Sequence, residues 1–286
     1  MSYHLYADDT QIYGSFEPSE SSTDEFVERI EKCISDVKIW MNKNKLVLNQ
    51  DKTETMLVGS SNNQSAIQKT HIQIEDSNIC FTKSVKNLGV YLDNNLSMSN
   101  QVNHIARCMY LELRNISKIR HLITTDIAAR LVTSLVLSKL DYCNSLLSGI
   151  TNDKIKKLQV IQNNAARLVL KKKKRDSASP LLKILHWLPV AKRIDYKVAT
   201  LCFKCINQSA PEYLSDLITL YVPSRQLRSS ADTLKLREPT FKKKTFGDRS
   251  FASYGPKTWN SLPKAIREAE NIDKFKSQLK TFLYTL

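Results

Sequence analysis

Residues 3–13 of this chain read Tyr-His-Leu-Tyr-Ala-Asp-Asp-Thr-Gln-Ile-Tyr. Two short β-prone runs, 3–6 and 10–13, flank the triplet Ala7-Asp8-Asp9, a pattern that predicts a β-hairpin with an acidic tip. Two neighbouring carboxylates repel each other unless a cation neutralises them, and a divalent metal ion supplies such a cation. The stretch therefore indicates either a metal-binding hairpin or an ordinary acidic surface turn.

The segment that follows the hairpin mixes helix and strand signals as far as residue 95. Ser22 and Glu25 have the spacing of a capping box, and the apolar residues behind them predict a helix of about 20 residues that ends near Asn44. Its apolar positions are Phe26, Ile30, Cys33, Ile34, Val37 and Met41. Strand-like pieces follow at 53–58, 71–74 and 85–92. We expect an α+β fold in which residues 1–95 form a partial antiparallel sheet with one helix.

The apolar spacing becomes helical from about residue 98. It predicts helices over 102–119, 127–135 and 151–170, and a fourth that is opened by Pro189 and reaches Cys205. Weaker signals near Trp259 and Phe275 suggest short closing helices. We therefore expect an α-helical bundle domain over 96–220 and a basic C-terminal segment with short helices over 221–286.

The charge is distributed unevenly along the 286 residues. Residues 1–100 hold 9 Lys and Arg against 14 Asp and Glu, a net charge of −5, whereas the remainder carries +20. This asymmetry favours a polyanionic partner contacted by the later part of the chain, with a merely soluble, lysine-rich surface as the alternative. The 42% of hydrophobic residues suffices for a real core.

Several classes of protein are disfavoured by composition. The six glycines stand apart, so no glycine-rich phosphate-binding loop exists. The six cysteines are scattered in apolar stretches, which points to a reducing intracellular location, nuclear or cytoplasmic. No apolar run approaches the roughly 18 residues that span a bilayer, so we expect no membrane insertion. Cys202 and Cys205 lack a second ligand pair and are interpreted as buried helix positions.

Residues 5–10, Leu-Tyr-Ala-Asp-Asp-Thr, resemble the Tyr-Ala-Asp-Asp motif of reverse transcriptases. Further blocks resemble jockey-like non-LTR retrotransposon enzymes in the same order: 48–54 (Leu-Asn-Gln-Asp-Lys-Thr-Glu), 87–93, 140–147, 186–190 and 254–263. Gln50 departs from the commoner proline, a change that affects turn stiffness. The resemblance covers nearly the whole chain and identifies it as the C-terminal part of such a polymerase, with partial palm, thumb and C-terminal region.

The resemblance implies an RNA-directed DNA polymerase, a nucleotidyltransferase that works on an RNA template and a DNA primer with two Mg²⁺ ions. By that likeness Asp8 and Asp9 are metal ligands and catalytic residues. Tyr6 lies near the primer terminus, and the turn at Leu88 and Gly89 grips the primer. Lys52 assists the leaving pyrophosphate or orients the incoming triphosphate, the alternative being a solvated turn lysine.

The resemblance also implies that part of the enzyme is missing. The family's third carboxylate and its fingers belong upstream of Met1, so we expect the isolated chain to be inactive and its palm remnant to be poorly covered. A truncated copy, a partial gene product and a fragment that pairs with another chain remain open. The alternative function is a non-enzymatic, basic nucleic-acid-binding module, and a third possibility is an unstable remnant.

Two basic tracts are candidate nucleic-acid contacts. The first comprises Lys171, Lys172, Lys173, Lys174 and Arg175. The second comprises Lys242, Lys243 and Lys244, with Arg237, Phe241 and Phe246 around it. The first tract follows a predicted helix, so it could equally serve to complement the helix dipole. The second could serve only loop solubility, or bind by charge and stacking.

Overall fold

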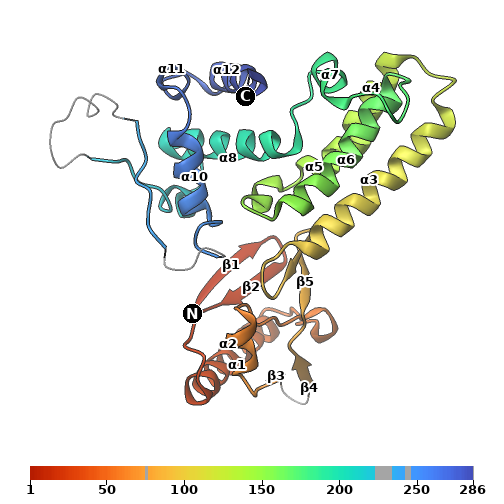
Figure 1. The fold of residues 1–286 in the computed structure, drawn as a ribbon. Helices are drawn as coiled ribbons and strands as arrows, with labels where there is room; N and C mark the ends of the chain where they lie inside the picture. Colours follow the sequence, from red (N-terminus) through yellow and green to blue (C-terminus); the bar gives the residue numbers. More distant parts are fainter. Residues whose placement is uncertain (75–76, 223–233, 242–245, 286) are drawn as a thin grey trace. The chain divides into compact units, whose positions relative to one another are not determined.

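The computed structural model describes residues 1–74, 77–222, 234–241 and 246–285. The chain has mixed α and β structure, as expected, and its contacts divide it into two compact units, Met1–Asn100 and Gln101–Leu286 (Figure 1). No helix among the described residues is long and apolar enough to cross a membrane.

The strands of the first unit pair as three separate antiparallel hairpins. They are β1 (Ser2–Tyr6) with β2 (Asp9–Tyr13), β3 (His71–Ile74) with β4 (Ser77–Cys80), and β5 (Ser84–Asn87) with β6 (Val90–Asp93). The hairpin expected at 3–13 is therefore confirmed. The single partial sheet that we expected is wrong for the described residues, because each strand of four or five residues pairs only with its hairpin neighbour.

Two of the expected strands have a different form. Residues 53–58 make only one isolated bridge, between Thr55 and Phe81. Residues 85–92 fold back on themselves as β5 and β6, because Leu88 and Gly89 both have positive φ, at 45° and 81°. Two positive φ values in a two-residue loop match the twist of an antiparallel hairpin.

Helix α1 (Glu20–Lys43) provides the cover for one hairpin. It begins three residues earlier than the capping box predicted, because the Ser19 side chain accepts the hydrogen bond of the Ser22 N–H; it ends at Asn44 as expected. Val27 packs with Ile72 and Ile74 of β3 in a small buried core. The Glu31 carboxylate accepts the Gln73 N–H at 2.8 Å, which ties the helix to β3.

The 3₁₀ turn η1 (Gln50–Lys52) and helix α2 (Ser61–Ser65) lie between α1 and β3. The chain passes from β6 into helix α3 through residues 94–98. The buried Asp93 carboxylate accepts the N–H groups of Ser97 and Ser99, at the start of helix α3. An acidic side chain at a helix N-terminus satisfies otherwise unpaired N–H groups and complements the helix dipole.

The second unit is helical, as the spacing predicted. Helices predicted over 102–119, 127–135, 151–170 and 189–205 are confirmed, and Pro189 caps the last of these rather than occupying its first turn. The elements are α3 (Ser99–Ile119), α4 (Thr125–Val132), the π-helical η2 (Thr133–Leu137), α5 (Ser138–Asp141), η3 (Asn144–Leu147), α6 (Asn152–Val169), α7 (Ala178–Ile184), α8 (Val190–Ile206), α9 (Glu212–Ser215), α10 (Phe251–Asn260), α11 (Lys264–Arg267) and α12 (Ile272–Thr285).

The core of the second unit is built around α8, against which α10 and α12 pack (Figure 1). Phe203, Trp259 and Phe275 form a buried aromatic cluster; the rings of Phe203 and Phe275 stack with their centroids 4.5 Å apart. The Trp259 indole N–H donates to the Leu234 carbonyl at 2.6 Å. Cys202 and Cys205 are buried on α8, which confirms their interpretation as buried helix positions.

Helices in both units end without glycine. Lys45, Lys171, His186 and Gln208 follow helix ends with φ near +50°. At each, the next N–H reaches back to a carbonyl five residues earlier, as from Lys172 to Arg167 at 2.9 Å. This is the hydrogen bonding of a Schellman motif, in which glycine is the usual residue. The scarcity of glycine therefore does not prevent sharp helix ends.

We predict that Trp259→Ala lowers the free energy of unfolding of the second unit by about 3–5 kcal/mol, because a fully buried aromatic side chain is removed from a packed cluster. Chemical denaturation followed by circular dichroism measures the change. Trp40→Ala is the matched control, because the Trp40 side chain is exposed, and it should change stability by less than about 0.5 kcal/mol. Equal losses in the two variants would contradict the assignment of the core.

Candidate functional site

The acidic hairpin is held by five pairs of residues between β1 and β2, the last of which joins Tyr6 to Asp9. Its loop is therefore only Ala7 and Asp8, and Asp9 is the first residue of β2. Ala7 has φ of 51°, a left-handed conformation that a small side chain tolerates better than a branched one. The short loop fixes two successive carboxylate-bearing residues at the end of a hydrogen-bonded ribbon.

Both aspartates are exposed. Carboxylate oxygens are the ligands that Mg²⁺ prefers, and this ion keeps several waters or substrate phosphates in its octahedral shell. Two exposed carboxylates can supply part of such a shell, while waters or substrate phosphates supply the rest. Among the described residues, no group of three or more His, Cys, Asp and Glu side chains is placed to hold a metal ion.

A second hairpin is tied to the acidic one. The Gln11 side-chain amide of β2 donates to the Asn87 side-chain oxygen of β5 at 2.7 Å. Asn87 directly precedes the turn residues Leu88 and Gly89, which were singled out in the sequence as a primer contact. The structure thus connects two stretches that are about 80 residues apart in the sequence through one side-chain hydrogen bond.

The ribbon of β1 and β2 is poorly covered on both of its faces. Tyr3 and Leu5 lie on one face, with 71% and 59% of their surface exposed, and Tyr6 lies on the other face with 62% exposed. Two strands alone are marginally stable in water. Tyr6, singled out as a primer contact, is thus an open aromatic side chain beside the acidic loop.

Lys52 occupies a separate capped turn. It is the last residue of η1, where the Asn49 side chain accepts the Lys52 N–H at 3.2 Å, and it is exposed. The Ser77 hydroxyl donates to the Gln50 side-chain oxygen at 3.0 Å, so Gln50 anchors this turn to β4. No hydrogen bond or ion pair of the described residues links Lys52 to Asp8 or Asp9.

The basic tract Lys171–Arg175 forms the turn between α6 and α7, and all five side chains are exposed. The Lys173 N–H donates to the Asp176 carboxylate at 2.8 Å, and the Arg167 guanidinium donates to the Asp176 carbonyl at 3.0 Å. These bonds order the turn while its cationic side chains stay in solvent. The other tract, Lys242 to Lys244, lies outside the described residues.

Three sequence blocks singled out in the second unit meet at α8. Asp141, in the 140–147 block, accepts a hydrogen bond from the Arg193 guanidinium at 2.6 Å. The same guanidinium donates to the carbonyl of Leu188, in the 186–190 block, at 3.0 Å. The Tyr254 hydroxyl, in the 254–263 block, donates to Asp195 at 2.9 Å. These contacts give the blocks a shared packing role.

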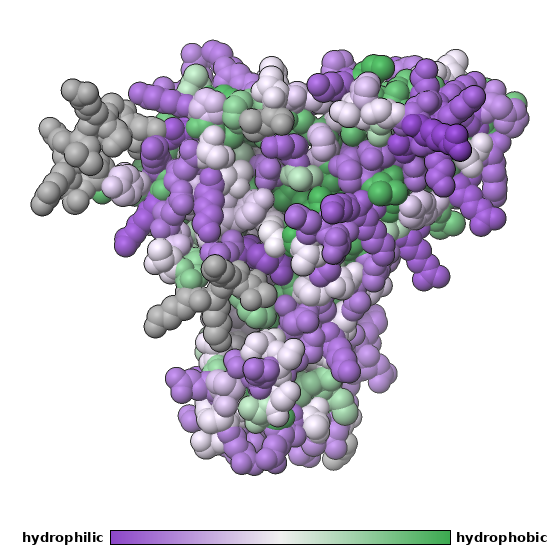
Figure 2. Space-filling view, in the orientation of Figure 1, coloured by the Kyte–Doolittle hydropathy of each residue, from purple (hydrophilic) through white to green (hydrophobic). Residues whose placement is uncertain are grey.

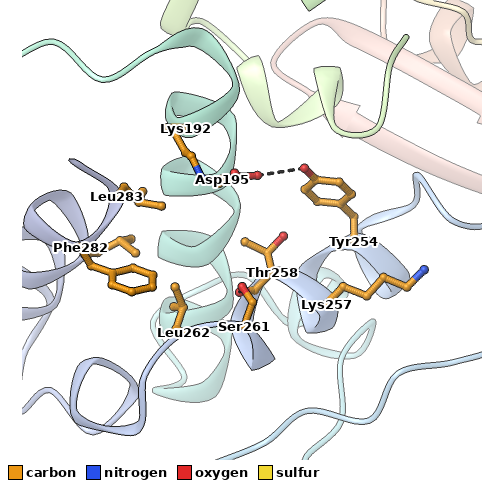
Figure 3. Close-up of a pocket in the computed structure, with 10 residues that line it drawn as sticks. Lys192, Asp195, Tyr254, Lys257, Thr258, Ser261, Leu262, Phe282 and Leu283 are labelled. Atoms are coloured by element: carbon orange, nitrogen blue, oxygen red, sulfur yellow. Dashed lines mark hydrogen bonds between the residues drawn. The ribbon is translucent and has the colours of Figure 1, made fainter. Parts of the chain in front are cut away.

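Sequence reasoning missed a pocket of about 280 Å³ that is lined by residues of α8, α10 and α12, and by Ser261 and Leu262 (Figure 3). Asp195 and Tyr254 face each other on its polar side, and Phe282 and Leu283 supply apolar side chains. Lys257, at its edge, pairs with Asp248 at 3.2 Å. The pair Asp195–Tyr254 is 59 residues apart in the chain, so no local spacing could have revealed it.

Burial raises the pKa values of two side chains in this pocket. It raises the pKa of the Asp195 carboxyl, against the opposing effects of the Tyr254 hydrogen bond and the Lys192 charge. Burial also raises the pKa of the Tyr254 phenol, and the negative charge of Asp195 adds to that rise. Tyr254 therefore remains a hydrogen-bond donor at neutral pH.

Comparison of the chain with known protein families, with curated proteins and with solved structures finds no match.

We predict that Asp195 makes the second unit less stable at neutral than at acidic pH. A carboxyl whose folded-state pKa is raised contributes stability below its unfolded pKa near 4, and this is lost as pH rises through the folded pKa. Compared with Asp195→Asn, the wild type should therefore gain free energy of unfolding as pH falls from 7 to 4.

Urea denaturation across that pH range measures the difference between the two proteins. Asp216→Asn, which removes an exposed aspartate of the same unit, is the matched control and should follow the wild-type profile. A difference between wild type and Asp195→Asn that is constant with pH would contradict the inferred rise of the Asp195 pKa.

Proposed function

We propose that this chain is the C-terminal portion of a non-LTR retrotransposon reverse transcriptase, which contributes the acidic turn of the palm, a thumb-like helical unit and a basic C-terminal region. The reaction is nucleotidyl transfer to a DNA primer on an RNA template. The observation that carries the proposal is the exposed pair Asp8 and Asp9 at a two-residue hairpin loop, in a sequence that resembles the family's catalytic turn.

In this proposal Asp8 and Asp9 hold Mg²⁺. The bound ion would supply Lewis-acid stabilisation of the charge that develops on phosphate oxygens. The chain's own groups have positioning roles: the hairpin ladder limits the movement of both carboxylates, and Tyr6 offers an aromatic surface to the primer terminus. Leu88 and Gly89 lie on a turn that is tied to the same hairpin by Gln11, so the primer contact and the carboxylates are mechanically linked.

The exposure of both faces of β1 and β2 supports the further proposal that this hairpin works beside other palm strands. Apolar side chains on an uncovered two-stranded ribbon are expected where neighbouring strands normally cover them. The third carboxylate of the family would reside on such a strand. The chain alone is therefore proposed to be inactive, and Lys52 is proposed to act only in the complete site.

We predict that a palm–fingers fragment of this enzyme family, added to the chain, restores Mg²⁺-dependent incorporation of dNTPs on a primed RNA. Asp8→Asn should lower the restored rate by about 10²–10³, because one charged group that stabilises the transition state is lost. Single-turnover extension of a labelled primer measures the rate, and folding is checked by circular dichroism.

Asp36→Asn is the control for this experiment, because Asp36 is an exposed aspartate on α1 of the same unit. Its rate should match that of the wild type. Absence of any restored synthesis, or restored synthesis that Asp8→Asn leaves unchanged, would overturn the polymerase proposal.

A second candidate function is that of a non-enzymatic nucleic-acid-binding module. The observation that favours it is the ordered turn Lys171–Arg175, where five exposed cations follow one another in a segment of the chain that carries +20 overall. Phosphate contacts by cations release counterions from nucleic acid and give salt-dependent affinity. This candidate needs no metal ion and no palm partner.

We predict that Asp8→Asn leaves the affinity of the chain for nucleic acid unchanged, because the cations of the second unit do not depend on the acidic hairpin. Fluorescence anisotropy with a labelled RNA–DNA hybrid measures the affinity at several salt concentrations. Affinity that does not respond to salt would speak against phosphate contact altogether.

A further inference from the structure

Two turns of the second unit lie together and form what we term the basic tip, residues 118–124 and 170–177. Arg120, whose side chain is buried, joins them. Its guanidinium donates to the Leu168 and Val169 carbonyls at the end of α6, at 3.0 and 2.6 Å, and to the Ile123 carbonyl at 2.8 Å. One buried guanidinium thus pairs with carbonyl groups at the end of α6 and holds the two turns next to each other.

The cationic side chains of the tip stand on turns that are closed by hydrogen bonds. Lys171 occupies the left-handed position of the helix end, and Asp176 closes the turn through its bond to the Lys173 N–H. The tip displays Lys118 together with the five cations of the tract, and all six are exposed. Figure 2 shows strongly hydrophilic residues gathered over this end of the unit, with a few hydrophobic ones beside them.

The tip lacks the large aromatic side chains on which the bases of a single strand usually stack. Residues 118–124 and 170–177 contain no Phe, Tyr or Trp, and single-stranded nucleic acid is held largely by bases stacked on such rings. Five of its six exposed Lys and Arg side chains are lysines, which act as point charges, beside Arg175 and the exposed His121. What remains is attraction to phosphate, and a duplex carries about twice the charge per unit length of one strand.

We propose that the basic tip binds the phosphate backbone of a nucleic-acid duplex without recognising its sequence. The inference rests on the proposed function only in taking nucleic acid as the polyanion. The further step is that the bound nucleic acid is a duplex and that the two turns of the tip contact it. Arg120 is a positioning residue, because its own charge is used on carbonyl oxygens within the tip.

The exposed Leu122 side chain makes it possible to distinguish duplex binding from binding to a lipid surface. Leu122 is 74% exposed within the tip. An aliphatic side chain that inserted into a membrane would contribute strongly to binding, whereas it adds little to a phosphate contact. Leu122→Ser should therefore leave duplex affinity unchanged.

The test is fluorescence anisotropy with the full chain, a 20-base-pair DNA duplex, a scrambled duplex of the same composition and one of the single strands, at several salt concentrations. The variant Lys172→Gln/Lys173→Gln/Lys174→Gln removes three tip cations. Its matched control, Lys139→Gln/Lys156→Gln/Lys280→Gln, removes three exposed cations elsewhere in the same unit. The corresponding Lys→Arg triple variant of the tip keeps the charge and reports on folding.

We expect the two duplexes to bind equally and more tightly than the single strand. The tip Gln variant should lose affinity, and its plot of log affinity against log salt should become shallower by up to about 2.7, at 0.9 per phosphate contact. The control and the Arg variant should follow the wild type. Tighter binding to the single strand, an equal loss in the control, or binding to anionic vesicles that Leu122→Ser abolishes would overturn the proposal.

Failure of this test leaves the polymerase proposal standing, because that proposal is judged by Asp8-dependent synthesis. Conversely, duplex binding by a chain that supports no synthesis would favour the nucleic-acid-binding module.

Discussion

The two-residue loop that places Asp8 and Asp9 next to each other is the constraint on which the rest of the first unit's proposed role depends. Two successive carboxylate-bearing residues at a two-residue loop cannot move far apart, because the Tyr6–Asp9 pair closes the ribbon directly behind them. In an ordinary surface turn, water alone would solvate two such carboxylates. A divalent cation bound between them would be attracted by both negative charges at once.

The two units differ in how much of their apolar surface they bury. The second unit has a large core, in which Phe203, Trp259 and Phe275 stack and three distant sequence blocks reach α8. The first unit has a small core around Val27, and its acidic hairpin leaves aromatic side chains open. We propose that further strands cover this ribbon in the complete protein.

The helices predicted over 102–119, 151–170 and 189–205 were predictable because their apolar positions repeat over four or five turns, and a long repeat outweighs local ambiguity. Shorter signals were less reliable. The serine at position 22 fits a capping box as well as Ser19 fits the cap that forms, and only the contacts of the folded chain distinguish them. Residues 85–92 resembled one strand because a positive φ at Leu88 leaves no mark in composition.

The candidate site was accessible to sequence reasoning only in part. Asp8, Asp9 and the basic turn were found because adjacent like charges stand out in a sequence. The Gln11–Asn87 bond and the Asp195–Tyr254 pair were not, because each joins residues that are far apart in the chain and chemically ordinary by themselves. Arg120 was missed for a related reason: a single arginine gives no sign that it will be buried against carbonyl groups.

The central claim, that the acidic hairpin binds a divalent metal ion, is tested most directly by paramagnetic broadening of amide NMR signals during titration with Mn²⁺. The account predicts selective broadening of residues 7–10, with weaker effects at Leu88 and Gly89, and its loss in Asp8→Asn/Asp9→Asn. Broadening that is absent from the hairpin, or that spreads evenly over the exposed acidic residues of α1, would contradict it.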